Sequence, residues 1–204
     1  NMNYKILTKS RLDYLDKFIS LEDKTILDVG AGQGHLANFI TSKKCTYAAV
    51  EFDEQMHTIL KKKGAVWETV EDVNKKFDII YLSHILEHVR DPKDFLKILS
   101  KNLKKGGCFF IEVPNKDDEF KLVFEPHILV FSSQSFHYLA NSLGFEVVKI
   151  DLVGDLVKNL RPNLKTRLLF FIFSNKQVKK YLLMLKSYLS SKRKLKYRDF
   201  KTQN

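Results

Sequence analysis

The first 150 residues alternate between short apolar runs and segments in which apolar residues recur at helical spacing. The apolar runs predict buried strands at residues 25–29, 47–51, 77–82, 108–113 and 145–151, with a weaker run near Ala65 and Val66. The helical spacings fall at residues 12–19, 36–40, 54–62, 91–103 and 136–143. Strands that alternate with helices imply parallel crossover connections. We therefore predict an α/β fold, in which a doubly wound, mostly parallel sheet carries helices on both faces.

Proline and glycine residues indicate where some of these elements begin and end. Pro92 is expected in the first turn of the helix that begins at Asp91, where its missing N–H costs nothing. The pair Gly106-Gly107 is expected to end that helix, and Pro114 is expected to stop the strand that follows.

Charge divides the chain into two parts. Residues 1–154 contain 21 Lys and Arg against 22 Asp and Glu, whereas residues 155–204 contain 14 against 2. The formal net charge of +11 therefore originates in the last quarter of the chain. We predict a core domain over residues 1–154 and a basic C-terminal extension over residues 155–204.

The basic extension has two candidate elements. Residues 168–173 form an apolar run that fits a final strand or part of a helix, and residues 176–194 have the pattern of a basic amphipathic helix. In the simplest interpretation this helix packs on the core with its lysines in solvent. It would also suit peripheral contact with an anionic membrane surface. Nucleic acid is the weaker alternative, because no aromatic-interleaved binding motif accompanies the charge.

Composition indicates an intracellular protein. Its 44% hydrophobic and 29% charged residues are ordinary for a globular domain. Cys45 and Cys108 lack zinc-type or CxxC spacing, and we expect them to be reduced and buried. The start of the sequence does not resemble a signal peptide. We expect a cytoplasmic location, with peripheral contact at the inner face of the membrane as the alternative.

A glycine-rich loop follows the first predicted strand. Asp28 precedes a GxGxG run at positions 30–34, and Glu51 ends the second strand. Ligands of doubly wound sheets bind beside the carboxyl ends of strands, and a carboxylate at position 51 can accept hydrogen bonds from both ribose hydroxyls. The spacing differs from the GxGxxG of dinucleotide sites, and Asp28 would oppose a pyrophosphate. This site suits a nucleoside with an ammonium and a sulfonium group and no phosphate.

Several motifs arrive in the order typical of one family. Residues 27–34 (LDVGAGQG) resemble the first motif of class I S-adenosylmethionine-dependent methyltransferases, and residues 50–53 (VEFD) resemble the second. Residues 77–80 (FDII) and 103–107 (LKKGG) are similar to the fourth strand and to the turn before the fifth. The resemblance covers roughly residues 20–151 and implies a seven-stranded sheet that ends in an antiparallel strand pair.

The resemblance also implies roles for individual residues. S-adenosylmethionine would be the methyl donor, with its methionine part and ribose held by Asp28, Gly30, Ala31, Gly32, Gly34 and Glu51. Phe52 would flank the adenine, and Ser83 would border the cofactor at the end of the fourth strand. The family's acid at the adenine edge has three candidates here, Glu68, Glu71 and Asp72, and the sequence does not choose among them.

Histidines follow the fourth strand. If residues 83–89 are helical, His84, Glu87 and His88 share one face. A histidine titrates near neutral pH and suits a base that removes a proton from a hydroxyl or amine acceptor. We therefore take His88, His84 and the distant His127 as candidate catalytic residues. The alternative is a structural turn, with His127 on a loop that contacts substrate or only packs.

A metal site is a further alternative, although no metal is our first expectation. Glu87 and His88 with His127 resemble the metal-binding set of ubiquinone-type O-methyltransferases and of small-RNA 3′-terminal 2′-O-methyltransferases. Those groups have an additional Glu where this chain has His84. A more nitrogen-rich set favours a transition metal over magnesium.

The functional hypothesis is methyl transfer from S-adenosylmethionine to a small-molecule acceptor, with S-adenosylhomocysteine as the product. The expected acceptor is a hydroxyl of a sugar, a lipid-linked compound or a secondary metabolite. An RNA methyltransferase that uses the basic extension is one alternative. A catalytically silent domain that acts as a binding partner or scaffold is the other. The oligomeric state is not predicted.

Overall fold

The computed structural model describes residues 2–40, 43–115, 127–152 and 168–175. Its helical elements are α1 (Met2–Asp16), α2 (Ala37–Ile40), α3 (Glu54–Lys61), a short 3₁₀ turn η2 (Leu86–His88), α4 (Pro92–Ser100) and α5 (Ser133–Ser142). Its strands are β1 (Thr25–Val29), β2 (Thr46–Val50), β3 (Ala65–Trp67), β4 (Phe77–Ser83), β5 (Leu103–Pro114), β6 (Phe145–Leu152) and β7 (Leu168–Asn175).

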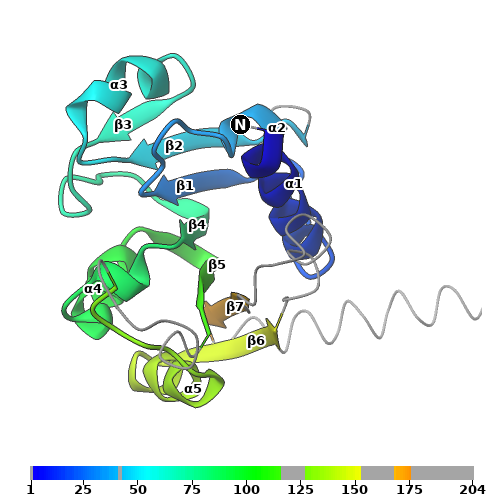
Figure 1. Ribbon diagram of the computed structural model, residues 1–204, viewed down its shortest axis with the longest axis vertical. Coiled ribbons are helices and arrows are strands. Elements are labelled where there is room, and N and C mark those ends of the chain that lie inside the picture. The colour runs from blue at the N-terminus through cyan, green and yellow to red at the C-terminus, as the bar shows by residue number, and fades with distance from the viewer. Residues whose placement is uncertain (1, 41–42, 116–126, 153–167, 176–204) are drawn as a thin grey trace, which may run out of the picture.

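The strands of the described residues form one seven-stranded sheet in the order β3-β2-β1-β4-β5-β7-β6 (Figure 1). The first five strands pair in parallel, and β7 lies antiparallel between β5 and β6. The predicted fold class is confirmed, and residues 168–173 belong to a strand. Because β1 is flanked by β2 on one side and β4 on the other, the strand order reverses at β1, where such sheets bind ligands.

Two apolar layers cover the sheet. Leu15 of α1, Ile40 of α2 and Leu60 of α3 are buried together on one face. Leu99 of α4 and Phe136 of α5 are buried on the other. Figure 1 shows α1 on one side of the sheet and α4 and α5 on the opposite side. In the described part of the chain, no helix has the length and apolar character needed to cross a bilayer.

The predicted end of the 91–103 helix is wrong. Helix α4 ends at Ser100, and β5 begins at Leu103, so Gly106-Gly107 lies inside the strand instead of ending the helix. Just after the helix, the Asn102 side chain donates hydrogen bonds to two carbonyl groups of the 73–75 loop. A Cβ at position 107 would lie 3.0 Å from carbonyl oxygens of β4, so glycine permits the close approach of the two strands.

The predicted basic helix at residues 176–194 lies outside the described residues, as does most of the extension from 155 to 204. The proposed contacts of this extension with a membrane or with RNA therefore stay predictions.

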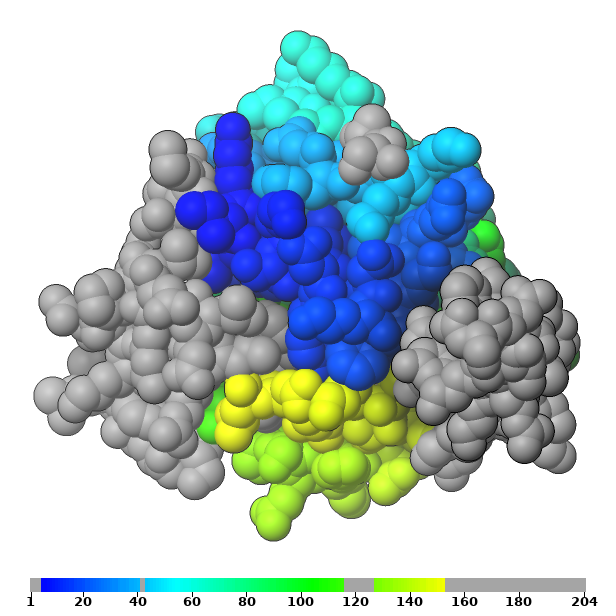
Figure 2. All heavy atoms as spheres, turned by 90° about the vertical axis from the view of Figure 1, so that its right-hand side faces the viewer, coloured from blue at the N-terminus to red at the C-terminus, as the bar shows by residue number. Residues whose placement is uncertain are grey.

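Helix α1 is fixed to the far edge of the sheet. Tyr14 donates a hydrogen bond of 2.9 Å from its hydroxyl to Oδ2 of Asp151 on β6. Figure 2 views the molecule from this side, with the blue N-terminal residues next to the yellow residues of β6. Since Leu15 is fully buried beneath the helix, the docking of α1 also rests on the apolar core.

Replacing Leu15 with Ala should lower the free energy of unfolding by about 2–5 kcal/mol, because the truncation leaves a cavity under α1. Ile6→Ala, on the same helix at a 40% exposed position, should cost less than about 1 kcal/mol. Urea denaturation of both variants checks this, and equal losses would show that α1 is not docked as described.

Candidate functional site

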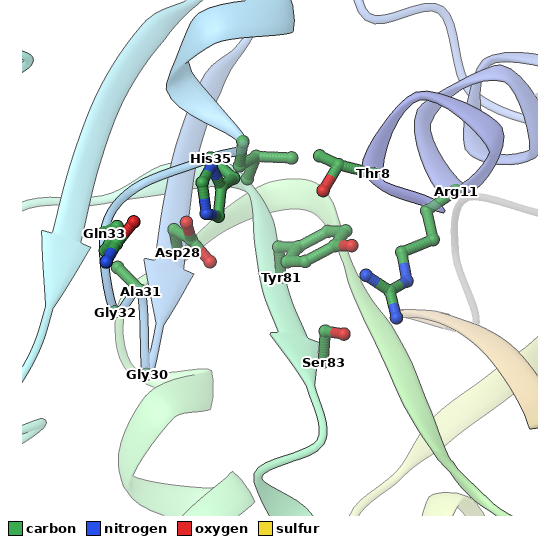
Figure 3. Close-up of a pocket in the computed structure, with 11 residues that line it drawn as sticks. Thr8, Arg11, Asp28, Gly30, Ala31, Gly32, Gln33, His35, Tyr81 and Ser83 are labelled. Carbon is green, nitrogen blue, oxygen red and sulfur yellow. The ribbon is translucent and has the colours of Figure 1, made fainter. Parts of the chain in front are cut away.

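A cavity of about 500 Å³ opens where the strand order reverses. Its walls come from α1, the glycine loop after β1 and the end of β4 (Figure 3). The lining residues are Thr8, Arg11, Asp28, Gly30, Ala31, Gly32, Gln33, His35, Leu36, Tyr81 and Ser83. Of the predicted cofactor residues, this lining includes Asp28, Gly30, Ala31, Gly32 and Ser83. Gly34, Glu51 and Phe52 are not among the lining residues.

The glycine loop turns sharply at the end of β1. The N–H groups of Gly30 and Ala31 both point to the carbonyl of Val50, at 2.8 and 3.3 Å. Gly30 has a φ of +72°, and a Cβ there would lie 2.0 Å from Cδ1 of Ile85. Glycine is therefore required at position 30 by both backbone conformation and space. Gly30 and Gly32 therefore border the cavity without a side chain, next to Ala31 and Gln33 of the same loop.

Asp28 places a carboxylate in the cavity wall. It is buried, and its Oδ2 accepts a hydrogen bond of 3.0 Å from the Tyr47 hydroxyl. Burial raises the pKa of Asp28 to about 7, although the Tyr47 hydrogen bond acts in the opposite direction. A bound cationic group near Asp28 would favour its ionised form.

Glu51 follows β2 and is also buried. Its Oε2 accepts a hydrogen bond from the Gly32 N–H at 2.6 Å, and its Oε1 accepts one from the Asp53 N–H at 3.0 Å. These bonds fix the carboxylate beside the glycine loop, and each oxygen keeps a second lone pair for a ligand. Phe52 is next in the chain and 83% exposed, so its ring is available to a ligand.

The three candidate acids at the adenine edge lie on the loop after β3. Glu68, Glu71 and Asp72 are all exposed, and none lines the cavity. Asp72 accepts a hydrogen bond of 2.7 Å from the Thr69 hydroxyl. The arrangement does not single out one of the three.

Sequence reasoning missed the contribution of α1. Thr8 and Arg11 line the cavity from this helix, and Figure 3 shows them across the cavity from the glycine loop. Arg11 pairs with the buried Glu112 of β5, 101 residues away. The one local signal was that Thr8, Arg11 and Leu15 share a helical face at i, i+3 and i+7.

The predicted helix over the histidines is wrong. Beyond Ser83, His84 has a left-handed φ of 57°, and only the 3₁₀ turn η2 follows. The His84 N–H donates to the Glu112 carbonyl at 3.0 Å, so this residue continues the pairing of β4 with β5, and its left-handed φ does not fit a helix. The histidines still meet: His88 and His127 pack edge to face, with ring centroids 4.9 Å apart.

Glu87 is the centre of this histidine cluster, which consists of His84, Glu87, His88 and His127. Its side chain is 1% exposed, and its Oε1 lies 3.1 Å from Nδ1 of His84 and 4.0 Å from Nε2 of His127. Its Oε2 is buried without a hydrogen-bond partner among the described residues. The main-chain carbonyl of Glu87 accepts hydrogen bonds from the N–H groups of Ile128 and Leu129, which brings His127 over η2.

Two buried carboxylates act on His84. Burial alone lowers the pKa of His84, but the hydrogen bond to Glu87 and the negative charges of Glu112 and Glu87 outweigh it and raise the pKa. His84 therefore keeps its proton to a higher pH than an ordinary histidine. His88 is exposed and His127 partly buried, so these two rings are the ones nearer to solvent.

Glu87, His88 and His127 can each offer one ligand atom, and these atoms lie within 4.8 Å of one another. A carboxylate and two imidazoles form a donor set that suits a divalent transition metal. The buried and unpartnered Oε2 of Glu87 fits the same assignment, because a cation would satisfy it.

Comparison with known proteins gives a consistent result. A family model described as a methyltransferase domain matches residues 4–150. The ubiquinone biosynthesis O-methyltransferase of Hydrogenovibrio crunogenus is 28% identical over 119 residues, which cover 52% of this chain and 49% of that protein. The chain therefore spans about half the length of this curated relative.

Solved structures share the fold. A SAM-dependent methyltransferase from Archaeoglobus fulgidus is similar with a TM-score of 0.65 and 19% identity, covering 84% of this chain and 94% of that one. The 1,6-didemethyltoxoflavin N1-methyltransferase of Burkholderia thailandensis, solved with S-adenosylhomocysteine, has a TM-score of 0.65 and 16% identity, covering 82% and 77%. At these identities the likeness establishes the fold.

The Asp28 carboxyl should titrate close to neutral pH, with a pKa of about 7. Tyr47→Phe removes a hydrogen bond to the ionised form and should raise the pKa of Asp28 further. Carboxyl ¹³C NMR titration measures both values. Tyr138→Phe, at an exposed position on α5, is the matched control and should leave the pKa unchanged. A wild-type midpoint near the ordinary value of 3.8, or a fall in Tyr47→Phe, would contradict this assignment.

Proposed function

The chain belongs to the methyltransferase domain family, and from that premise we propose that it methylates a hydroxyl group of a small-molecule acceptor with S-adenosylmethionine as donor. The observation that carries the proposal is the cavity itself, which is lined by the buried carboxylate of Asp28 and by the loop that contains Gly30 and Gly32. A cationic group of the ligand matches the Asp28 carboxylate in this lining.

The chain's own residues would hold the cofactor in two places. Asp28 and the main chain of Gly30, Ala31, Gly32 and Gly34 would bind the methionine part, with Ser83 at the border of the same cavity. Glu51 would accept hydrogen bonds from the ribose hydroxyls, and the exposed ring of Phe52 would cover the adenine. S-adenosylmethionine supplies a methyl group on a positively charged sulfur, so transfer needs alignment of the acceptor more than further activation.

The histidine cluster would accept the proton that the acceptor loses. It begins at His84, directly after Ser83, which lines the cofactor cavity. A hydroxyl acceptor must lose a proton during transfer, and the exposed His88 can take it and pass it to solvent. The His127 ring packs against His88 and orients it. His84, held by the Glu87 carboxylate, orients Glu87 beneath both rings.

The proposed acceptor class is supported by this chemistry and by the names of the relatives. The curated relatives are named O-methyltransferases, which supports oxygen as the accepting atom. We propose a hydroxyl of a sugar, a lipid-linked compound or a secondary metabolite.

A metal-assisted version of the same reaction is the second candidate. The orphaned Oε2 of Glu87 and the convergence of His88 and His127 favour it. Glu87, His88 and His127 would hold the ion, and His84 would fix the other oxygen of Glu87. A bound divalent ion supplies Lewis acidity, which lowers the pKa of a hydroxyl group beside it.

Isothermal titration calorimetry with S-adenosylhomocysteine tests the proposed cofactor. The wild type should bind, and Glu51→Ala should weaken binding about tenfold or more, because charge-assisted hydrogen bonds to the ribose are lost. Glu22→Ala removes the same charge at an exposed position and should bind like the wild type. Failure of the wild type to bind would overturn the proposed function.

Cobalt(II) titration followed by visible absorption tests the metal version without any activity assay. The wild type should bind one ion and show the d–d absorption bands of cobalt(II) coordinated by imidazole. His127→Ala should lose these bands, because it lacks one of the three ligands. His137→Ala, an exposed histidine on α5, should retain them. If the wild-type bands are no stronger than those of His127→Ala, the metal-assisted version is rejected and His88 remains the proposed base.

A further inference from the structure

Glu112 is a carboxylate buried near the carboxyl end of β5. It lies on β5 and has 0% exposure, yet it is not among the residues that line the cavity. A buried ionised carboxylate is costly unless charged and polar partners surround it. The partners of Glu112 therefore indicate the role of this residue.

The strongest partner is Arg11. Its Nη2 donates to Oε1 of Glu112 at 3.0 Å, and its Nε lies 2.5 Å from Oε2. The two charges meet side-on, a geometry that fixes the plane of the guanidinium group. Figure 3 shows the Arg11 side chain extending from α1 toward Ser83 and Tyr81. Glu112 thus sets the orientation of a cationic group in the cavity wall.

The second partner is the end of β4. The Ser83 hydroxyl donates to Oε2 of Glu112 at 2.6 Å, and Nε2 of His84 lies 3.8 Å from Oε1. One carboxylate therefore contacts residues from α1 and β4 that are more than 70 positions apart in the sequence. Both Arg11 and Ser83 line the cavity, and His84 begins the histidine cluster.

We propose that Glu112 is a positioning residue for the cofactor, which fixes Arg11 and Ser83 as one wall of the cavity without touching the ligand. The proposal rests on the proposed function, since it takes S-adenosylmethionine as the ligand of this cavity. Without the carboxylate, the buried guanidinium has no counter-charge at this position and leaves the orientation that the cavity requires. The N-terminal helix then no longer completes the site.

Glu112→Gln tests the proposal, because it keeps the size of the side chain while it removes the charge and replaces one of the two acceptor oxygens by an N–H donor. Binding of S-adenosylhomocysteine, measured by calorimetry, should weaken roughly tenfold or more. The side-chain Nε–H signal of Arg11 in ¹H–¹⁵N NMR of the ligand-free protein, assigned through Arg11→Lys, should shift in the same variant. Val113→Ala alters the next residue, buried on the opposite face of β5, and should leave both readouts unchanged.

A double-mutant cycle separates positioning through Arg11 from general damage to the fold. Arg11→Met combined with Glu112→Gln should lose clearly less affinity than the sum of the two single losses, because the part of the effect that acts through Arg11 is already gone. Fully additive losses would overturn the proposal, as would wild-type affinity and an unshifted Arg11 signal in Glu112→Gln. If Glu112→Gln does not fold, Glu112→Asp replaces it in both measurements and should give an intermediate loss of affinity.

The NMR readout keeps this proposal distinct from the proposed function. If the wild type fails to bind S-adenosylhomocysteine, the proposed function fails and the cofactor role of Glu112 fails with it. The Arg11 signal would still report whether Glu112 orients that side chain.

Discussion

Four carboxylates are buried at the carboxyl edge of the parallel strands, and the need to give each one partners organises the site. Asp28, Glu51, Glu87 and Glu112 are all less than 9% exposed. A carboxylate removed from water must be hydrogen-bonded, paired with a cation or protonated. The partners of these four carboxylates come from α1, the glycine loop, β2, β4 and the histidine cluster, and Glu87 and Glu112 both lie next to His84.

The sheet makes this concentration of charge possible. Its parallel strands end at one edge, where β2 and β4 flank β1 and leave a crevice between their loops. Two apolar layers hold the strands and helices in place, so the polar groups need not stabilise the fold by themselves. The carboxylates then contribute mainly to orientation, each fixing backbone or side-chain groups around the cavity.

Local patterns predicted the parts of the molecule that depend on local physics. The alternation of strands and helices predicted the doubly wound sheet, and the glycines after β1 predicted a tight loop, where a Cβ on Gly30 would collide with Ile85. Elements whose limits depend on tertiary contacts were predicted less well. Asn102, which follows α4, bonds to the distant 73–75 loop, and His84, with its left-handed φ, bonds to β5 where a helix had been considered. Arg11 could not be paired with Glu112 from sequence, because 101 residues separate them.

A crystal structure of the chain with S-adenosylhomocysteine tests the central claim, that the buried carboxylates build a site for this nucleoside. The account predicts the ligand's amino group within hydrogen-bonding distance of Asp28 and both ribose hydroxyls on Glu51, with Arg11 still paired to Glu112. A ligand bound elsewhere on the molecule, or one in this cavity that contacts neither Asp28 nor Glu51, would contradict it.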